Sequence, residues 1–231
     1  MNAAGWLRRA RPLLGTLVEI GVARGTGDAV TAGFDAIAAV QARLSRFEPA
    51  SDIGRFHALA AGERTAIDEH TATVLAAAAE LQAQSDGLFD VSIGSAPRGW
   101  RLDGRWLRKD DPAVRLDLGG IGKGYAVDRA VHALQQRGCI AGWVNAGGDL
   151  RAFGDIDVPL VLRDEVTGGV RPFGTLGDGA FATSRLPAYG AHASVAAPLA
   201  LWADALTKIV AASGDATHPL LARHGARAWL H

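Results

Sequence analysis

LDLGGIGKGYAVD, residues 116–128, places four glycines between a predicted strand that ends at Asp117 and a predicted helix that begins near Tyr125. Because glycine has no side chain, backbone N–H groups in such a run can approach a ligand closely. The start of a helix favours an anion, and Lys123 adds a mobile positive charge suited to phosphate. The stretch predicts a seat for a diphosphate, in which Asp117 can bind a ribose or adenine group. It matches neither the Walker A nor the Rossmann pattern, and the alternative is a glycine-rich packing turn with a surface lysine.

The spacing of apolar residues predicts the elements around this stretch. Asp28 can cap a first helix, and Ser85-Asp86-Gly87 can end a second one. The predicted helices are 28–46, 69–84, 125–137, 200–212 and 216–224. The predicted strands are 13–23, 105–109, 114–118, 140–145, 149–153, 158–163, 180–183, 193–197 and 226–230. Because the strands come in pairs and do not alternate one for one with helices, the pattern favours an α+β fold with antiparallel sheets over a doubly wound parallel sheet.

Length and composition limit the classes of function. The 231 residues suffice for one large domain or two small lobes, and the turn-rich segment 94–113 is predicted to be a surface loop between lobes. Lys and Arg total 24, as do Asp and Glu, so there is no strong basic field for nucleic acid or an anionic membrane. The single cysteine, Cys139, excludes an intramolecular disulfide and thiolate zinc clusters, and we interpret it as a small core residue.

The N-terminal segment MNAAGWLRRARPLLGT is basic but lacks the apolar stretch of a secretory signal. No uncharged apolar run elsewhere is long enough to cross a bilayer. As written, the sequence predicts a soluble, cytoplasmic protein without a membrane span. A periplasmic location is the alternative if a signal has been removed.

Two further segments suggest contacts with a ligand. In SDGLFDVS, residues 85–92, Phe89 could pack on a flat ring and Asp90 could accept a hydrogen bond from one. The alternative is a helix end leading into a strand, with Phe89 in the core. In NAGGDLRAFG, residues 145–154, two glycines before Asp149 mark a tight turn, for which the alternative is a plain hairpin with a polar tip.

The segment ADALTK, residues 203–208, offers hard oxygen ligands at the start of a helix. Asp204 and Thr207 lie three residues apart on one helix face, as a magnesium site would require. The alternative is an acid that serves the helix dipole and pairs with Lys208 at the i+4 position. The seven histidines show no metal-binding spacing, and there is no Gly-x-Ser-x-Gly elbow of a serine hydrolase.

Taken in order, these segments resemble the FAD:protein FMN transferases, the ApbE family. The matching stretches are PLLGTLVEI at 12–20, LSRFEPASDIGRFH at 44–57, SDGLFDVSIG at 85–94, LDLGGIGKGYAVD at 116–128, VNAGGDLRAFG at 144–154, ATS at 182–184 and ADALTK at 203–208. The ordered combination covers most of the chain and is more specific than any one piece. The resemblance implies an α+β fold related to the tunnelling fold, in one FMN-transferase-like domain over residues 1–231. The alternative is that the domain divides into two lobes with the flavin site between them.

The resemblance also implies the residues of a site. Asp204, Lys123 and His192 are the candidates for catalysis. Mg²⁺ is expected to be held by the main-chain carbonyl of Gly120 and the side chains of Asp204 and Thr207. The residues expected to bind FAD are Leu14, Phe47, Leu88, Phe89, Asp90, Asp117, Lys123, Gly148 and Ser184.

Three departures from the family pattern bear on that site. The family commonly has a Ser-Thr pair where this chain has Thr207-Lys208, and an ammonium cannot ligate a cation. Lys208 either weakens the metal site or supplies part of the metal's charge. The usual histidine followed by an Asp-Pro-Arg-Thr-Gly-like segment is missing, so His192 is only a candidate replacement. The family's Ser-Gly is Ser184-Arg185 here, and Arg185 either clamps a phosphate or fills a gap.

The expected reaction is phosphoryl transfer that is Mg²⁺-dependent. A serine or threonine hydroxyl of a flavin-acceptor protein attacks the FMN-side phosphorus of FAD, and AMP leaves. Asp204 and His192 are the candidates for the base. One alternative is FAD pyrophosphatase activity, in which water is the acceptor. Others are a non-catalytic flavin-binding protein with a degraded metal site and an α+β domain without a flavin site.

Overall fold

The structure is a computed structural model that describes residues 5–23, 27–163, 168–186 and 191–231. Its helices are α1 (Gly27–Leu44), α2 (Asp52–Ala58), α3 (Glu69–Gln84), α4 (Gly122–Gln136), α5 (Ala200–Ser213) and α6 (Pro219–Arg223). Its strands are β1 (Trp6–Leu13), β2 (Thr16–Ala23), β3 (Arg64–Ala66), β4 (Trp100–Asp103), β5 (Trp106–Lys109), β6 (Gly142–Ala146), β7 (Asp149–Phe153), β8 (Val158–Arg163), β9 (Val170–Leu176), β10 (Gly179–Leu186), β11 (Ala191–Ala197) and β12 (Arg227–Leu230). All strand pairs among the described residues are antiparallel, which confirms the expected α+β class.

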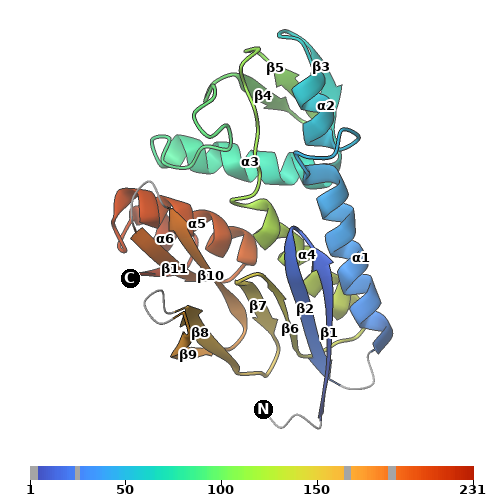
Figure 1. The fold of residues 1–231 in the computed structure, drawn as a ribbon, viewed down its shortest axis with the longest axis vertical. Coiled ribbons are helices and arrows are strands. Elements are labelled where there is room, and N and C mark those ends of the chain that lie inside the picture. Colours follow the sequence, from blue (N-terminus) through green and yellow to red (C-terminus); the bar gives the residue numbers. More distant parts are fainter. Residues whose placement is uncertain (1–4, 24–26, 164–167, 187–190) are drawn as a thin grey trace.

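A seven-stranded sheet, in the order β1-β2-β6-β7-β10-β11-β12, forms one end of the molecule (Figure 1). Helices α4 and α5 pack against it and against each other, and α1 packs on α4. The small sheet β3-β5-β4 and α2 form the other end, with α3 lying crosswise between the two ends. This layering puts the start of α4 and the start of α5 in the middle of the molecule.

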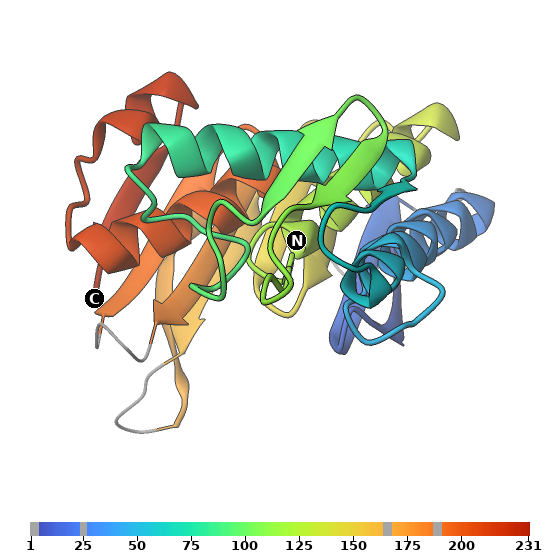
Figure 2. The same ribbon diagram turned by 90° about the horizontal axis from the view of Figure 1, so that it is seen from above.

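The hairpin β8–β9 covers part of the opposite face of the large sheet. Seen from above, it projects from the sheet on the side away from α3 (Figure 2). A separate apolar cluster forms beneath it, and its members include Trp143, Leu150, Leu160 and Phe181. The large sheet therefore has helices on one face and the hairpin on the other, and this separation decides which side chains can meet.

The apolar periodicity in the sequence accounts for the main packing. Val18, Ile20 and Val22 alternate along β2 and are fully buried, as expected of a strand with one face in the core. The buried stripe expected for α4, including Ala126, Ala130 and Leu134, is also present. Cys139 lies in the same core, as predicted. This apolar cluster runs through both ends of the molecule, although the one-domain organisation of the whole chain stays a prediction.

Helix α3 has the bounds that the sequence predicts, because both of its ends carry local signals. Asp68 accepts a hydrogen bond from the backbone of His70 at the start, and Ser85 caps the end. Asp86 and Gly87 then take positive φ angles of 50° and 83°, which stops the helix. Helix α1 also lies where it was expected, although it begins at Gly27, so Asp28 is in its first turn and not at the cap.

Several predicted bounds are wrong. The strand predicted at 13–23 is two strands, because Leu14 and Gly15 take φ angles of 55° and 71° and turn the chain into a hairpin. The segment 114–118 has no regular secondary structure and pairs with no described strand. The polar segment 94–113 is not a plain loop, since it contains the β4–β5 hairpin. Four further elements, α2, β1, β3 and β9, were not predicted.

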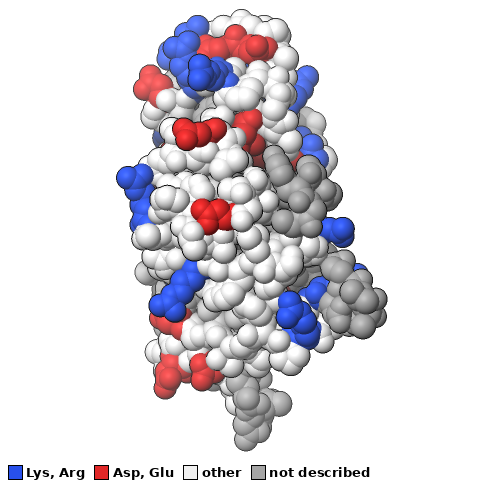
Figure 3. Space-filling view, turned by 90° about the vertical axis from the view of Figure 1, so that its left-hand side faces the viewer, with Lys and Arg blue, Asp and Glu red and all other residues white. Residues whose placement is uncertain are grey.

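The surface agrees with the balanced composition. On the face shown in Figure 3, the described Lys and Arg residues lie in small separate groups, some of them beside Asp and Glu, without a broad field of one sign. Within the described ranges, the longest and most apolar helices still fall short of what spanning a bilayer requires.

Candidate active site

The glycine run forms a tight loop from Leu118 to Ile121, and α4 starts directly after it at Gly122. The helix begins three residues before Tyr125, where the sequence placed its start. Asp117 fixes the entry to the loop, because its Oδ1 accepts a hydrogen bond of 2.8 Å from the N–H of Gly119. At the cap position, the apolar side chain of Ile121 cannot accept a hydrogen bond. The N–H of Gly122 already donates to the Leu118 carbonyl oxygen at 2.7 Å, so the N–H of Lys123 and the positive end of the helix are what this turn offers an anion.

Gly124 brings the second half of the site to this helix start. A Cβ atom at this position would lie 2.1 Å from the carbonyl oxygen of Ala200, so only glycine lets α4 and α5 approach this closely. The N–H of Gly124 donates to Oδ2 of Asp204 at 3.1 Å. Residues 80 positions apart in the sequence thus meet in one place, as the sequence analysis expected for the glycine loop and Asp204.

Asp128, one turn further along α4, also holds α4 and α5 together. Its two carboxylate oxygens accept hydrogen bonds of 2.9 Å from the N–H groups of Ala200 and Leu201, the first residues of α5. Its Oδ1 also accepts from Nη1 of Arg151 on β7 at 2.6 Å. A side chain of the glycine-rich stretch therefore caps α5 and sets its position relative to α4.

Four charged side chains converge at this crossing. Lys123 pairs with Asp149 at the start of β7, and Lys208 pairs with Asp204 one helical turn earlier on α5. The Asp204 side chain is fully buried and that of Asp149 is 3% exposed, whereas both lysines reach the surface. Lys208 also donates to Ser184 Oγ on β10 at 2.7 Å. The result is two buried acids, each covered by an ammonium group.

The pKa directions follow from this arrangement. Burial raises the pKa of Asp149 to about 6, and the negative charge of Asp204 acts in the same direction. For Lys123, burial alone would lower the pKa, but the charges of Asp204 and Asp149 outweigh it and the pKa is raised. For Asp204, burial opposes ionisation, but Lys208 and Lys123 outweigh it and the pKa is lowered. At neutral pH Lys123 is therefore charged and Asp204 is ionised.

Two cavities flank the glycine loop and share Asp117, Gly119 and Lys123 in their linings. The first, of about 220 Å³, is also lined by Leu14, Arg46 and Phe47. The second, of about 430 Å³, is also lined by Leu88, Phe89, Asp90, Gly120, Ser184 and Lys208. An elongated ligand can therefore cross the loop with its middle over Lys123 and one end in each cavity.

Phe47 gives the first cavity an open aromatic face. Its side chain is 77% exposed, and the Arg46 guanidinium carbon lies 4.5 Å from the ring centroid. Nε of Arg46 also pairs with Oδ2 of Asp117 at 3.1 Å, which ties this ring to the glycine loop. The arrangement suits stacking of a flat ligand ring between an aromatic side chain and a polar edge.

The side chains expected to contact a ligand in the second cavity differ in how far they are exposed. Leu88 is 39% exposed and can contact a ligand, whereas Phe89 is 4% exposed and belongs to the core. The Asp90 carboxylate accepts hydrogen bonds from the N–H groups of Ser92 and Gly94, at 2.8 and 3.0 Å, and from Ser92 Oγ and Gln82 Nε2. The burial of Phe89 after the end of α3 fits the structural alternative, although no strand follows among the described residues before β4, and the contact of Phe89 and Asp90 with a ligand stays a prediction.

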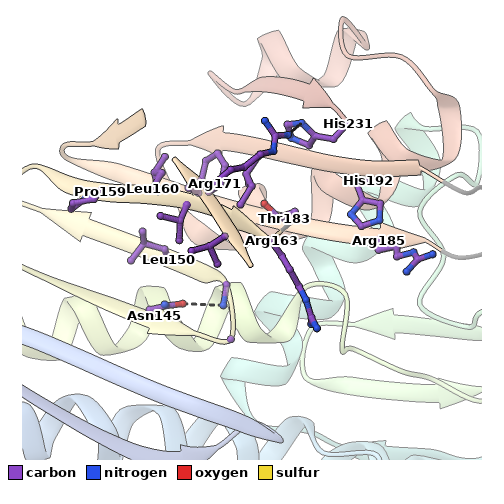
Figure 4. A pocket seen from close by; sticks show the side chains of 16 residues that line it. Asn145, Leu150, Pro159, Leu160, Arg163, Arg171, Thr183, Arg185, His192 and His231 are labelled. Atoms are coloured by element: carbon purple, nitrogen blue, oxygen red, sulfur yellow. Dashed lines mark hydrogen bonds between the residues drawn. The ribbon is translucent and has the colours of Figure 1, made fainter. Parts of the chain in front are cut away.

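His192 and Gly148 are not brought to this cluster. They line a third cavity, of about 460 Å³, between the large sheet and the β8–β9 hairpin (Figure 4). Side chains alternate along a strand, so Ser184 faces α5 while its neighbour Arg185 faces the hairpin. His192 is paired with Arg185 in the β10–β11 register, which puts both on the face of the sheet opposite Lys208. The sequence could not decide this, because a shift of one residue would reverse it.

Gly148 lies in the β6–β7 turn, directly before Asp149. Gly148 lines the cavity under the hairpin, whereas Asp149 pairs with Lys123 on the other face of the sheet. Its N–H donates to Asn145 Oδ1 at 2.9 Å, the dashed line in Figure 4. Gly148 has a φ of 106° and Gly147 a φ of 64°, so this turn needs glycine at both positions. The expectation of a tight turn is confirmed, while its contact with a ligand stays a prediction.

Two of the three expected magnesium donors, the side chains of Asp204 and Thr207, already have partners. Oδ1 of Asp204 accepts from Lys208 and Oδ2 accepts from the N–H of Gly124. The Thr207 hydroxyl donates to the main-chain oxygen of Asp204 at 2.6 Å. Among the described residues, no group of three or more His, Cys, Asp or Glu side chains is placed to hold a metal ion. As arranged here, the donor set does not fit a divalent cation.

Three residues of this site were not singled out by the sequence analysis. Asp149 looked like the tip of a turn, and Arg46 and Asp128 were not distinguished from surface charges. Asp128 had a detectable signal, because it is an acid on the helix that follows a glycine loop. The roles of Asp149 and Arg46 depend on partners far away in the sequence, which no local pattern reveals.

Comparison with known proteins places these features in a family. The family model described as "ApbE family" matches residues 14–106 and 97–185, which together exceed half of the 231 residues. A curated FAD:protein FMN transferase from Rhodobacter capsulatus is 29% identical over 42% of this chain. Another, from Vibrio cholerae serotype O1, is 26% identical over 63% of it. The match spans only 24% and 54% of the length of these relatives.

Solved structures show the same fold. The flavin transferase ApbE from Vibrio cholerae aligns over 97% of this chain and 93% of its own, with a TM-score of 0.83 and 18% identity. The ApbE protein from Thermotoga maritima aligns over 97% and 94%, with a TM-score of 0.85 and 21% identity. The expected relation to the ApbE-type fold is therefore confirmed.

Proposed function

The chain belongs to the ApbE family, and on that premise we propose that it transfers the FMN half of FAD to a hydroxyl group of another protein. One observation carries the proposal. The glycine loop, the start of α4 and Lys123 form one surface with a cavity on each side, and its charge suits an anion. FAD has the matching layout, with a central diphosphate and a flat ring system at each end.

The diphosphate is proposed to lie over the loop between Asp117 and Lys123. The positive end of α4, the backbone N–H of Lys123 and its ammonium group are proposed to neutralise the negative oxygens. Phe47 and Leu14 in one cavity and Leu88 in the other offer apolar surface for the ring systems. Asp117, whose side chain is partly exposed at the boundary of both cavities, is the group proposed to accept hydrogen bonds from a ribose.

The proposed chemistry is a displacement at phosphorus. The oxygen of a serine or threonine hydroxyl on the acceptor protein forms a bond to the FMN-side phosphorus. The bond from that phosphorus to the bridging oxygen breaks, and AMP leaves with the bridging oxygen and its electron pair. Such a reaction depends on alignment and on neutralised oxygens more than on covalent help from the enzyme. Lys123 is proposed to stabilise the charge that develops on the diphosphate.

The hydroxyl proton has two predicted acceptors, Asp204 and His192. Asp204 is fully buried and both of its carboxylate oxygens accept hydrogen bonds, so its proposed part is to position Lys208 and Gly124. His192 lines the cavity on the other face of the sheet, which reaches the β6–β7 turn through Gly148. An acceptor hydroxyl that uses His192 would have to approach from that side.

Magnesium dependence, expected from the family resemblance, stays a prediction. Of the donors named for it, Gly120 lines the second cavity, whereas the Asp204 and Thr207 side chains are fully buried on α5. Their hydrogen bonds to neighbouring groups argue against a divalent ion in this arrangement, so no step of the proposed reaction passes through one.

The proposal is tested by incubating the protein with FAD and a flavin-acceptor domain, with and without Mg²⁺, followed by mass spectrometry. Transfer attaches one FMN, through its phosphate, to a serine or threonine of the acceptor and releases AMP. Release of free FMN and AMP without any adduct would instead show a pyrophosphatase. Binding of FAD with no turnover would show a non-catalytic flavin protein, and no binding of FAD would overturn the proposal altogether.

A matched pair of variants ties the activity to the proposed surface. Lys123→Met removes the ammonium at the start of α4, and Arg137→Met removes an exposed positive charge at the end of the same helix. The first is expected to abolish most of the transfer and the second to leave it unchanged. Equal losses in both variants would mean that Lys123 has no special role.

A further inference from the structure

We propose that the ammonium group of Lys208 takes the place of a divalent cation, so that this chain binds the diphosphate of FAD without a metal. The identity of the ligand, FAD, rests on the proposed function. The contacts of the ammonium group do not depend on it, because they are made entirely by residues of the chain.

The contacts of Lys208 are those of a bound cation. Its Nζ pairs with Oδ1 of Asp204, lies 3.0 Å from the main-chain oxygen of the same residue and 2.7 Å from Oγ of Ser184. An ammonium group has three protons, and three oxygens from α5 and β10 surround it. The Asp204 side chain is fully buried, so its charge is matched by this ammonium and not by solvent.

Lys208 lies next to the residues that were expected to ligate magnesium. It pairs directly with Asp204 and shares the main-chain oxygen of that residue with the Thr207 hydroxyl. Its Cε lies 3.4 Å from the place where a Cβ would stand on Gly120. A divalent ion within reach of the same oxygens would have to displace the ammonium or lie beside it, and like charges at that separation repel.

The local charge balance points the same way. Asp149 and Asp204 carry two negative charges, and Lys123 and Lys208 carry two positive ones. The acids are therefore already matched, and no excess negative charge remains among these four side chains to attract Mg²⁺. In the family pattern a hydroxyl stands where Lys208 is found here, so the same pocket would have one positive charge fewer.

The ammonium faces the side where the ligand is proposed to bind. Lys208 and Lys123 both line the 430 Å³ cavity, together with Gly119 and Gly120 of the loop. Two ammonium groups and the backbone donors of the loop can then hold one diphosphate from several sides. A phosphate oxygen that replaces the Ser184 hydroxyl would leave the two contacts of Lys208 with Asp204 intact.

The test compares FAD binding in EDTA and in Mg²⁺ for the wild type, Lys208→Thr and Lys208→Met. Flavin fluorescence gives the dissociation constants. The wild type should bind FAD equally in both media, within about twofold. Lys208→Thr restores a hydroxyl and should bind at least about tenfold more weakly in EDTA, with recovery in Mg²⁺. Lys208→Met keeps the length but not the charge, and should bind at least about tenfold more weakly in both media.

A metal measurement without flavin keeps this inference separate from the proposed function. Electron paramagnetic resonance of Mn²⁺ should show no bound ion in the wild type, whether FAD is present or not. Stoichiometric Mn²⁺ that is lost in Asp204→Asn would overturn the inference, even if FAD did not bind. So would wild-type FAD binding that disappears in EDTA, or Lys208→Met that binds FAD in EDTA as tightly as the wild type. If FAD fails to bind in any medium, the proposed function fails, and the Mn²⁺ result alone decides the role of Lys208.

Discussion

Asp52 and Asp204 are both fully buried, yet their surroundings differ. The Asp52 carboxylate accepts hydrogen bonds from the N–H of Asp68 at 2.7 Å, from Thr71 Oγ1 at 2.5 Å and from Arg55 Nη2 at 2.5 Å. These groups belong to α2 and to the start of α3. As far as the structure describes their linings, the cavities beside the glycine loop include neither Asp52 nor its donors. Asp52 therefore joins two helices.

Asp204 joins two helices as well, through the N–H of Gly124, but its second partner opens onto a cavity. Lys208 is held by Asp204 and lines the space next to the glycine loop. Burial alone thus does not separate a structural acid from one in a site. What separates them is whether the partner cation faces a ligand cavity, and the following predictions test that distinction.

Asp204→Asn is expected to have the largest effect on function. Without the carboxylate, Lys208 loses the group that holds it at the cavity floor, and FMN transfer should fall by about 10²–10³-fold, equivalent to about 2.7–4 kcal/mol. Values of kcat/KM with an acceptor domain measure the loss. The matched variant Asp52→Asn should stay within about threefold of the wild type per folded molecule. Similar losses in both variants would erase the distinction.

Asp52→Ala is expected to have the larger effect on stability. It leaves the N–H of Asp68 and the Thr71 hydroxyl buried without an acceptor, which should cost about 3 kcal/mol. The corresponding fall in Tm is about 6–12 °C for a chain of this length. Calorimetry measures it, and FAD affinity below the transition should be unchanged. A variant that melts like the wild type would show that these hydrogen bonds contribute little.

Gly124→Ala should link stability and function at the Asp204 site. The new Cβ would lie 2.1 Å from the Ala200 carbonyl oxygen, so α5 must move away from α4, at a cost of about 2 kcal/mol. Denaturant unfolding and FAD titration should both show a loss. Gly174→Ala on β9 is the control, because its Cβ would meet nothing within 4 Å and should change stability by less than about 0.5 kcal/mol. Loss of stability with full FAD affinity would argue that the α4–α5 crossing does not position the ligand.

Asp149 should give the smallest effect, visible in the pH dependence of stability. Burial raises its pKa to about 6, above the value of about 3.9 in an unfolded chain. Between these values the native state binds the extra proton, so this group stabilises the fold as pH falls from 7 to 5, by about 1.4 kcal/mol. The unfolding free energy of the wild type minus that of Asp149→Asn should therefore rise as the pH is lowered from 7 to 5. A difference that is flat or falls would show that Lys123 keeps Asp149 ionised in this range.

The sequence predicted those parts of the fold whose signals are local. Helix α3 has an N-terminal Asp68 and a C-terminal Gly87, and both its bounds were predicted correctly. Strand β1 was missed because WLRRARPL lies at the sheet edge with four of its eight side chains basic or proline and no regular alternation. The start of α4 was placed too late, since the glycines that suggested a loop are needed in the helix for its contact with α5.

For the site, the sequence could indicate the residue types but not their mutual positions. The glycine run, Lys123 and Asp204 were found by their chemistry, and the structure brings them together. The face of the sheet on which His192 lies depends on strand register. The pairing of Asp149 with Lys123 depends on the packing of α4 against β7. Such relations arise only when distant segments fold onto one another.

Binding of a diphosphate by the glycine loop and Lys123 is the interaction on which the proposed function depends most. Dissociation constants for FAD and for riboflavin, which lacks phosphate, test this directly in the wild type, Lys123→Met and Arg137→Met. The wild type and Arg137→Met should prefer FAD by about 100-fold or more, and Lys123→Met should lose about 10- to 100-fold in affinity for FAD while riboflavin binding stays the same. Equal wild-type affinities for the two ligands, or an equal loss for both in Lys123→Met, would contradict the account.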